Sequence, residues 1–141
     1  MKIKFKKINE NIIGISEPAI VGDVGYDFYT SEEKVLKAKS SNVFSTGVMI
    51  ELPENYWMNI APKSGLATKY EINVHAGVID NGYRGEIKIM LYNHSDKDYF
   101  FNKNEKIAQG IIRKSYVFEL EESDELSTTI RDKDGFGSTG K

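Results

Sequence analysis

Residues 76–86 carry a carboxylate and a phenol three positions apart, Asp80 and Tyr83, on either side of the dipeptide Asn81-Gly82. That dipeptide is typical of a two-residue hairpin turn, because both central positions of the turn need a positive φ. Asp80 and Tyr83 would then face each other across the ladder. We therefore predict a β-hairpin with both side chains at its tip. Taken alone, the pair is equally a turn aspartate and a surface tyrosine.

Four other short segments carry polar groups suited to a phosphate, a metal or a base. They are 24–28 with Asp27, 61–67 with Lys63-Ser64-Gly65, 106–109 with Gln109, and the glycine-rich end 131–141 with Arg131 and Phe136. Each also has a plain structural interpretation as a turn, a strand edge or a chain terminus. No single segment identifies a function.

These polar groups lie between or within many short segments with alternating apolar residues, which are separated by residues typical of turns. We expect strands near 3–8, 26–30, 43–52, 56–61, 78–79, 87–92, 99–101 and 106–113, with a bulge at Gly47 and one helical turn over 66–70. Long helical periodicity is absent from the sequence. The pattern predicts an all-β domain, a distorted jelly roll or barrel-like fold.

Composition limits the chemistry. The chain has 141 residues, no cysteine, two histidines and a net charge of −2. This excludes disulfides, a thiolate nucleophile and a multi-histidine metal cage, and leaves oxygen ligands, which suit magnesium. The charge balance also argues against stable binding to nucleic acid, including a single-stranded nucleic-acid binder built on a β-barrel.

The N-terminus lacks a signal-peptide core, and no apolar run approaches the length needed to span a membrane. We therefore expect a cytoplasmic protein, or a nuclear one if the source is eukaryotic or viral. Composition changes after Phe118, where the acidic run 119–127 precedes the glycine-rich end. We expect one β domain over 1–118 and a flexible arm over 119–141.

Taken together, five segments resemble, in order, the five motifs of the trimeric dUTPase family (deoxyuridine triphosphate nucleotidohydrolases). The segments are 24–28 (VGYDF), 61–67 (APKSGLA), 77–85 (GVIDNGYRG), 106–109 (KIAQ) and 135–140 (GFGSTG). They span nearly the whole chain. The resemblance implies a homotrimer that hydrolyses dUTP to dUMP and pyrophosphate with Mg²⁺, which keeps uracil out of DNA and supplies dUMP for thymidylate synthesis.

The resemblance also implies a role for each matching residue. Asp80 would orient and deprotonate the water that attacks the α-phosphorus, Tyr83 would exclude a ribose 2′-hydroxyl, and Asp27 would contact magnesium through water. Uracil would be read by the backbone of Ala76, Gly77, Val78 and Ile79 and near Lys88. The phosphates would be held by Lys63, Ser64, Gly65 and Gln109, and a neighbouring subunit's arm would add Arg131, Phe136, Gly137, Ser138 and Thr139.

The chain departs from the family's pattern at several positions. Lys63 stands where arginine is usual, which removes a two-pronged phosphate contact. Gly82 replaces an acid, Gly110 replaces a leucine and leaves an expected gap in a strand, and Asp132 and Asp134 replace glycines.

Two alternatives to the dUTPase function remain open from the sequence. The related dCTP deaminases share the fold and a similar turn but need a catalytic glutamate where this chain has Met90. A regulatory protein that binds dUTP with little turnover would keep the same pocket.

Overall fold

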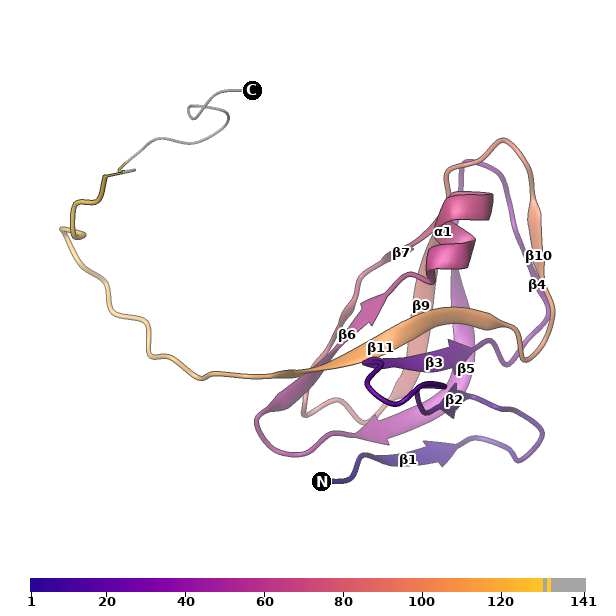
Figure 1. Cartoon of the computed structure of the whole chain (residues 1–141), viewed down its shortest axis with the longest axis horizontal. Helices are drawn as coiled ribbons and strands as arrows, with labels where there is room; N and C mark the ends of the chain where they lie inside the picture. The colour runs from indigo at the N-terminus through magenta and orange to yellow at the C-terminus, as the bar shows by residue number, and fades with distance from the viewer. Residues whose placement is uncertain (131, 133–141) are drawn as a thin grey trace.

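The computed structural model describes residues 1–130 and 132, which form one β domain followed by an extended segment (Figure 1). The elements are β1 (Lys4–Lys7), β2 (Ile15–Ser16), β3 (Gly25–Tyr29), β4 (Lys34–Leu36), β5 (Ser41–Glu51), β6 (Tyr56–Ala61), α1 (Ser64–Tyr70), β7 (Ile72–His75), β8 (Val78–Ile79), β9 (Glu86–Asn93), β10 (Tyr99–Phe101) and β11 (Lys106–Lys114). In this described part, α1 is the one helix, and it is too short to cross a membrane.

The strands form three sheets, with orders β1-β5-β9-β7, β2-β3-β11-β6-β8 and β10-β4. All pairs are antiparallel. The predicted all-β, jelly-roll-like class is confirmed, although the sheets do not close into a barrel. Figure 1 shows β11 running across the molecule between β3 and β6.

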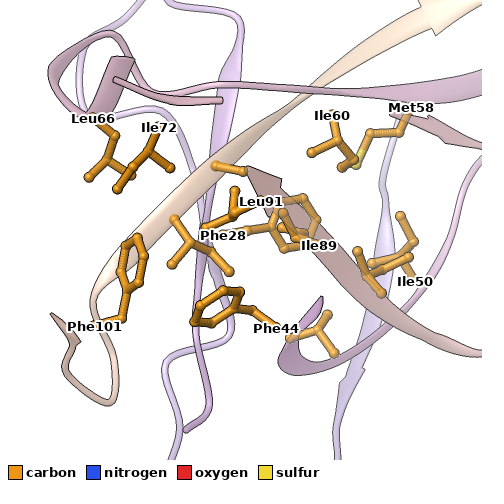
Figure 2. Packing of buried hydrophobic residues seen from close by; sticks show 14 of the residues in the cluster. Phe28, Phe44, Ile50, Met58, Ile60, Leu66, Ile72, Ile89, Leu91 and Phe101 are labelled. Carbon is orange, nitrogen blue, oxygen red and sulfur yellow. The ribbon is translucent and has the colours of Figure 1, made fainter. Parts of the chain in front are cut away.

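The core lies between the two larger sheets. On β9, Ile87, Ile89 and Leu91 are buried while Lys88 is exposed, as the alternation in the sequence predicts. Phe44 and Phe101 meet edge to face, with ring centroids 5.0 Å apart (Figure 2). Burial of this apolar face is what stabilises the two sheets against each other.

The bulge predicted at Gly47 is present. Gly47 has a φ of 69°, and the register between β5 and β9 shifts between Ser45 and Met49. A Cβ at Gly47 would lie 2.3 Å from the Ile12 side chain, so this position needs glycine for space as well as for conformation.

The hairpin predicted around Asn81-Gly82 is wrong. β8 pairs with β6 in one sheet, whereas β9 pairs with β5 and β7 in the other. Neither Asn81 nor Gly82 has a positive φ. The reason is tertiary: β8 pairs with β6 and β9 pairs with β5 and β7, so the two flanking strands belong to different sheets and cannot pair with each other.

The gap expected at Gly110 is also absent. A Cβ there would lie 2.5 Å from the sulfur of Met58 and 2.8 Å from the ring of Phe28. These two side chains already fill the space that a larger residue at this position would occupy. Glycine at 110 is therefore matched to its neighbours, and the strand is continuous.

This packing makes Gly110 a test of the core. We expect Gly110→Ala to lower the free energy of unfolding by about 2 kcal/mol, because the added methyl overpacks Met58 and Phe28. Gly82→Ala is the matched control, since nothing lies within 4 Å of its Cβ position. Urea unfolding of both variants measures the difference, and equal stabilities would contradict the packing argument.

Candidate active site

Asp80 and Tyr83 lie together at the edge of a small pocket, although not through a hairpin. The Tyr83 N–H donates to the Asp80 carbonyl over 3.1 Å, which closes a four-residue turn. The pocket encloses about 180 Å³. It is lined by Val78, Ile79, Asp80, Tyr83, Glu86 and Lys88. We call Asp80, Tyr83, Glu86 and Lys88 the tip cluster.

Asn81 anchors this turn to the rest of the fold. Its side-chain amide donates to the carbonyls of Leu52, Pro53 and Tyr56 over 3.2, 2.7 and 3.2 Å. The sequence suggested that Asn81 serves the turn by adopting a positive φ, whereas it holds the turn against the β5–β6 connection. A residue's preference for turns does not reveal such a distant partner.

The ring of Tyr83 is fixed in place. Its hydroxyl donates to the Glu86 carbonyl over 2.9 Å, and the ring folds over Gly85, where a Cβ would lie 2.4 Å from the hydroxyl oxygen. Glu86 in turn accepts a 2.9 Å hydrogen bond from the Gly47 N–H and so ties the pocket to the bulge of β5. No motif in the sequence pointed to Glu86.

Ala76 and Gly77 mark the point where the chain passes from one large sheet to the other. Ala76 adopts a φ of 57°, between β7 and β8. The Gly77 carbonyl accepts a 2.7 Å bond from the Ile60 N–H, and a Cβ on Gly77 would lie 2.7 Å from the Ile60 oxygen. Close contact with β6 thus requires glycine here, independently of any bound base.

A second group of expected site residues gathers on β3, β11 and β6. The register sets Asp27 opposite Gln109, and Gln109 opposite Ala61. Gln109 donates to the Pro62 carbonyl over 3.0 Å. We call Asp27, Gln109, Lys63 and Lys106 the lysine cluster.

The Asp27 carboxylate is buried at the centre of that cluster, and both of its oxygens are paired. Oδ1 lies 2.5 Å from Nζ of Lys63 and Oδ2 lies 2.7 Å from Nζ of Lys106. Burial alone would raise the pKa of Asp27, but the hydrogen bonds from Lys106 and Lys63 outweigh it, and the net pKa is lowered. The same hydrogen bond raises the pKa of Lys106.

Lys63 reaches Asp27 from the residue that precedes α1. Its backbone is extended, and its side chain does not cap the helix. Ser64 and Gly65 are exposed at the start of α1, next to this ion pair. The structure therefore places the expected phosphate-binding segment beside Gln109.

The lysine cluster does not have the donor set of a metal site. Both Asp27 oxygens are taken by ammonium groups, and the described residues contain no group of three or more His, Cys, Asp or Glu side chains that could hold an ion. Two cations beside one carboxylate repel a further cation. The described residues thus do not fit a magnesium ion held by this chain alone.

The two clusters lie at opposite ends of β6. Asn81 contacts Tyr56 at its first residue, and Gln109 pairs with Ala61 at its last. Ile79 pairs with Met58, so Asp80 follows opposite Trp57; at about 3.3 Å per residue, roughly 13 Å of strand separates Asp80 from Gln109. Of the remaining expected residues, Arg131, Phe136, Gly137, Ser138 and Thr139 lie outside the described residues.

Comparisons with known proteins bear on this arrangement. The dUTPase family model matches residues 12–140. The deoxyuridine 5'-triphosphate nucleotidohydrolase of Clostridium acetobutylicum is 44% identical over 142 residues, which cover 99% of this chain and 97% of that protein. The protein of the same name from Oryza sativa subsp. japonica is 40% identical over 138 residues, covering 98% of this chain and 80% of that protein.

Solved structures are also similar. The dUTPase of Staphylococcus bacteriophage 80alpha with dUPNHPP has a TM-score of 0.91 at 27% identity, covering 99% of this chain and 98% of that one. A mutant dUTPase from phage phi11 of S. aureus, described with a structural Mg(II) ion, has a TM-score of 0.81 at 24% identity. The match covers 89% of this chain and 98% of that one.

The ion pairs of Asp27 predict a pH dependence of stability. A lowered pKa means that the carboxylate stabilises the fold fully above its ordinary value of 3.8 and that this stabilisation is lost as the pH falls through the lower folded-state value. We expect Asp27→Asn to lower the free energy of unfolding at pH 7 by about 2 kcal/mol. The difference from wild type should shrink below pH 3.8.

Urea unfolding at pH 7 and pH 3 measures this difference. Asp124→Asn is the control, because Asp124 is exposed in the segment after β11 and should not change stability at either pH. If Asp27→Asn lowers the free energy of unfolding by the same amount at both pH values, charge does not stabilise the cluster.

Proposed function

Because this chain belongs to the dUTPase family, we propose that its tip cluster and lysine cluster together hydrolyse dUTP to dUMP and pyrophosphate. The observation that carries the assignment of roles is the position of Asp80. Its carboxylate is exposed at the edge of the pocket beside Tyr83 and Lys88, and no described residue donates a hydrogen bond to it.

Asp80 would act as the general base. A water molecule between its carboxylate and the α-phosphorus would transfer a proton to Asp80 as its oxygen attacks phosphorus. The bond from the α-phosphorus to the bridging oxygen then breaks, and pyrophosphate leaves. A positioned base of this kind contributes about 10²–10⁴-fold to the rate.

The pocket would select a deoxyribose and a uracil. Tyr83 is held by a hydrogen bond to the Glu86 carbonyl and by its packing over Gly85, and its ring in this position would disfavour a ribose 2′-hydroxyl. The backbone of 76–79 would supply the hydrogen-bonding groups for uracil, with Lys88 on the far side of the pocket. Unpaired polar groups would then disfavour cytosine.

Lys63 and Gln109 of the lysine cluster, with Ser64 and Gly65, would hold the phosphates. Family resemblance implies Mg²⁺, which would neutralise charge on the triphosphate. Since Asp27 is already paired with two ammonium groups, we propose that the ion enters with dUTP and meets Asp27 only through water. We assign no metal site to the free subunit.

We propose a homotrimer with shared sites, as the family resemblance implies, and the distance between the clusters supports it. Asp80 would act at the α-phosphorus and Gln109 would hold the same triphosphate, so a separation of roughly 13 Å along β6 favours a Gln109 from a neighbouring chain. A neighbouring subunit would bring its lysine cluster to this subunit's tip cluster. Residues 119–141 would form an arm that reaches a further subunit's site, with Phe136 stacking on uracil and Arg131, Gly137, Ser138 and Thr139 at the γ-phosphate.

Asp80 provides the direct test of the function. We expect Asp80→Asn to lower kcat for dUTP by at least about 10²-fold while dUTP binding is retained, because only the proton acceptor is lost. Pyrophosphate release from dUTP, dCTP, dTTP and UTP with Mg²⁺ should show strong preference for dUTP in the wild-type protein. Unchanged turnover by Asp80→Asn would contradict the mechanism.

The other outcomes separate the alternatives. Ammonia or a uridine product from dCTP would indicate a deaminase. Tight dUTP binding by the wild-type protein without turnover would indicate a regulatory protein.

Shared sites can be tested by mixing two inactive variants. If the clusters of one site come from two subunits, exchange of Asp80→Asn and Lys63→Ala subunits creates sites with both residues intact. Random mixing at equal amounts should restore about a quarter of wild-type sites. Activity is measured before and after subunit exchange, and each variant alone is the control. No gain on mixing would place the whole site within one chain.

A further inference from the structure

Lys106 lies in the lysine cluster but has no role in the function proposed above. We propose that Lys106 is a second cationic contact for the triphosphate of the substrate and that Asp27 is the residue that positions it. This inference rests on the proposed function, because it concerns the ligand of the same site.

A bulge in β11 is what brings Lys106 to the site. Asp27 pairs with Gln109 and Phe28 with Ala108, so regular pairing would set Ile107 opposite Tyr29. Lys106 stands there instead, because the register shifts between residues 106 and 108. The extra residue turns Ile107 into the core, where it is 0% exposed.

The bulge also decides which face Lys106 occupies. Asp27 and Tyr29 are two positions apart on β3 and so share a face, and the residues opposite them, Gln109 and Lys106, share it too. Without the shift, Lys106 would point to the opposite face of the sheet. A bulge beside a site commonly redirects a side chain in this way.

Asp27 holds both lysines without covering them. Its side chain is 8% exposed, whereas those of Lys63 and Lys106 are 28% and 47% exposed. Each ammonium has three N–H donors and gives one to Asp27, which leaves two for a ligand. Lys106 also lies 5.8 Å from the centre of the Tyr29 ring, which further limits its movement.

The number of charges points to an anionic ligand. One ammonium, that of Lys63, is enough to neutralise the buried Asp27 carboxylate. A second ammonium leaves a net charge of +1 at a half-exposed position beside Gln109. A polyphosphate is the part of dUTP that such a surplus would bind, since neither the base nor the sugar carries charge.

Lys106→Gln tests this role. We expect the KM for dUTP and the inhibition constant of inorganic triphosphate to rise about tenfold, because one charge-assisted contact is lost. The inhibition constant of dUMP should stay within about twofold, because the α-phosphate alone lies nearer the tip cluster. Lys106→Arg should restore most of the affinity, since it keeps the charge.

Lys103→Gln is the matched control. Lys103 is exposed in the turn before β11, and its removal makes the same change in net charge three residues away. A wild-type KM and wild-type triphosphate inhibition in Lys106→Gln would overturn the inference. Equal weakening of dUMP and triphosphate, together with a lower melting temperature, would also overturn it by showing a structural role.

Failure of the proposed function would look different. Binding of inorganic triphosphate to the wild-type protein and to Lys106→Gln is measured by calorimetry without turnover. A wild-type protein that binds triphosphate through Lys106 but does not hydrolyse dUTP would refute the proposed function and support the inference. A wild-type protein that hydrolyses dUTP with no contribution from Lys106 would support the proposed function and refute the inference.

Discussion

The antiparallel ladder of β3, β11 and β6 is the constraint on which both clusters depend. Its register sets Asp27, Gln109 and Ala61 in one row, and the chain beyond Ala61 then delivers Lys63 to the buried carboxylate. The other end of β6 receives the turn that carries Asp80, through the side chain of Asn81. A slip of one residue in this ladder would turn each of these side chains to the opposite face.

Sequence patterns correctly predicted the features of the fold that depend on residues close together in the chain. The alternation along β9 predicted its buried face, and Gly47 marked a bulge, because each depends on residues a few positions apart. Asn81-Gly82 misled for the same reason: the preference of the dipeptide is local, whereas the partners of β8 and β9 are chosen by the sheets. The strands β2, β4 and β7 were not predicted from the sequence; they form by pairing with β3, β10 and β9.

The sequence named candidate residues for the site but not their electrostatics. The motifs pointed to Asp27 and Lys63 separately, one for magnesium and one for phosphate, yet the two form a single ion pair. Nothing in the spacing of residues 27, 63 and 106 reveals a shared carboxylate, because the ladder that joins them is long-range. Lysine at 63 therefore keeps a fixed direction that its flexible side chain would otherwise lack, and this offsets part of what arginine's fork would provide.

The segment after β11 exposes several apolar side chains. Beyond β11, Tyr116, Phe118 and Leu120 are 67%, 79% and 101% exposed, on a segment that leaves the domain (Figure 1). Exposed apolar side chains on an extended segment have a reason to be there if another surface covers them. In the proposed function a substrate contacts both clusters, and their separation along β6 favours a second chain. The proposed assembly would meet two needs at once: it would cover apolar surface, and it would bring Asp80 within reach of the residues proposed to hold the phosphates.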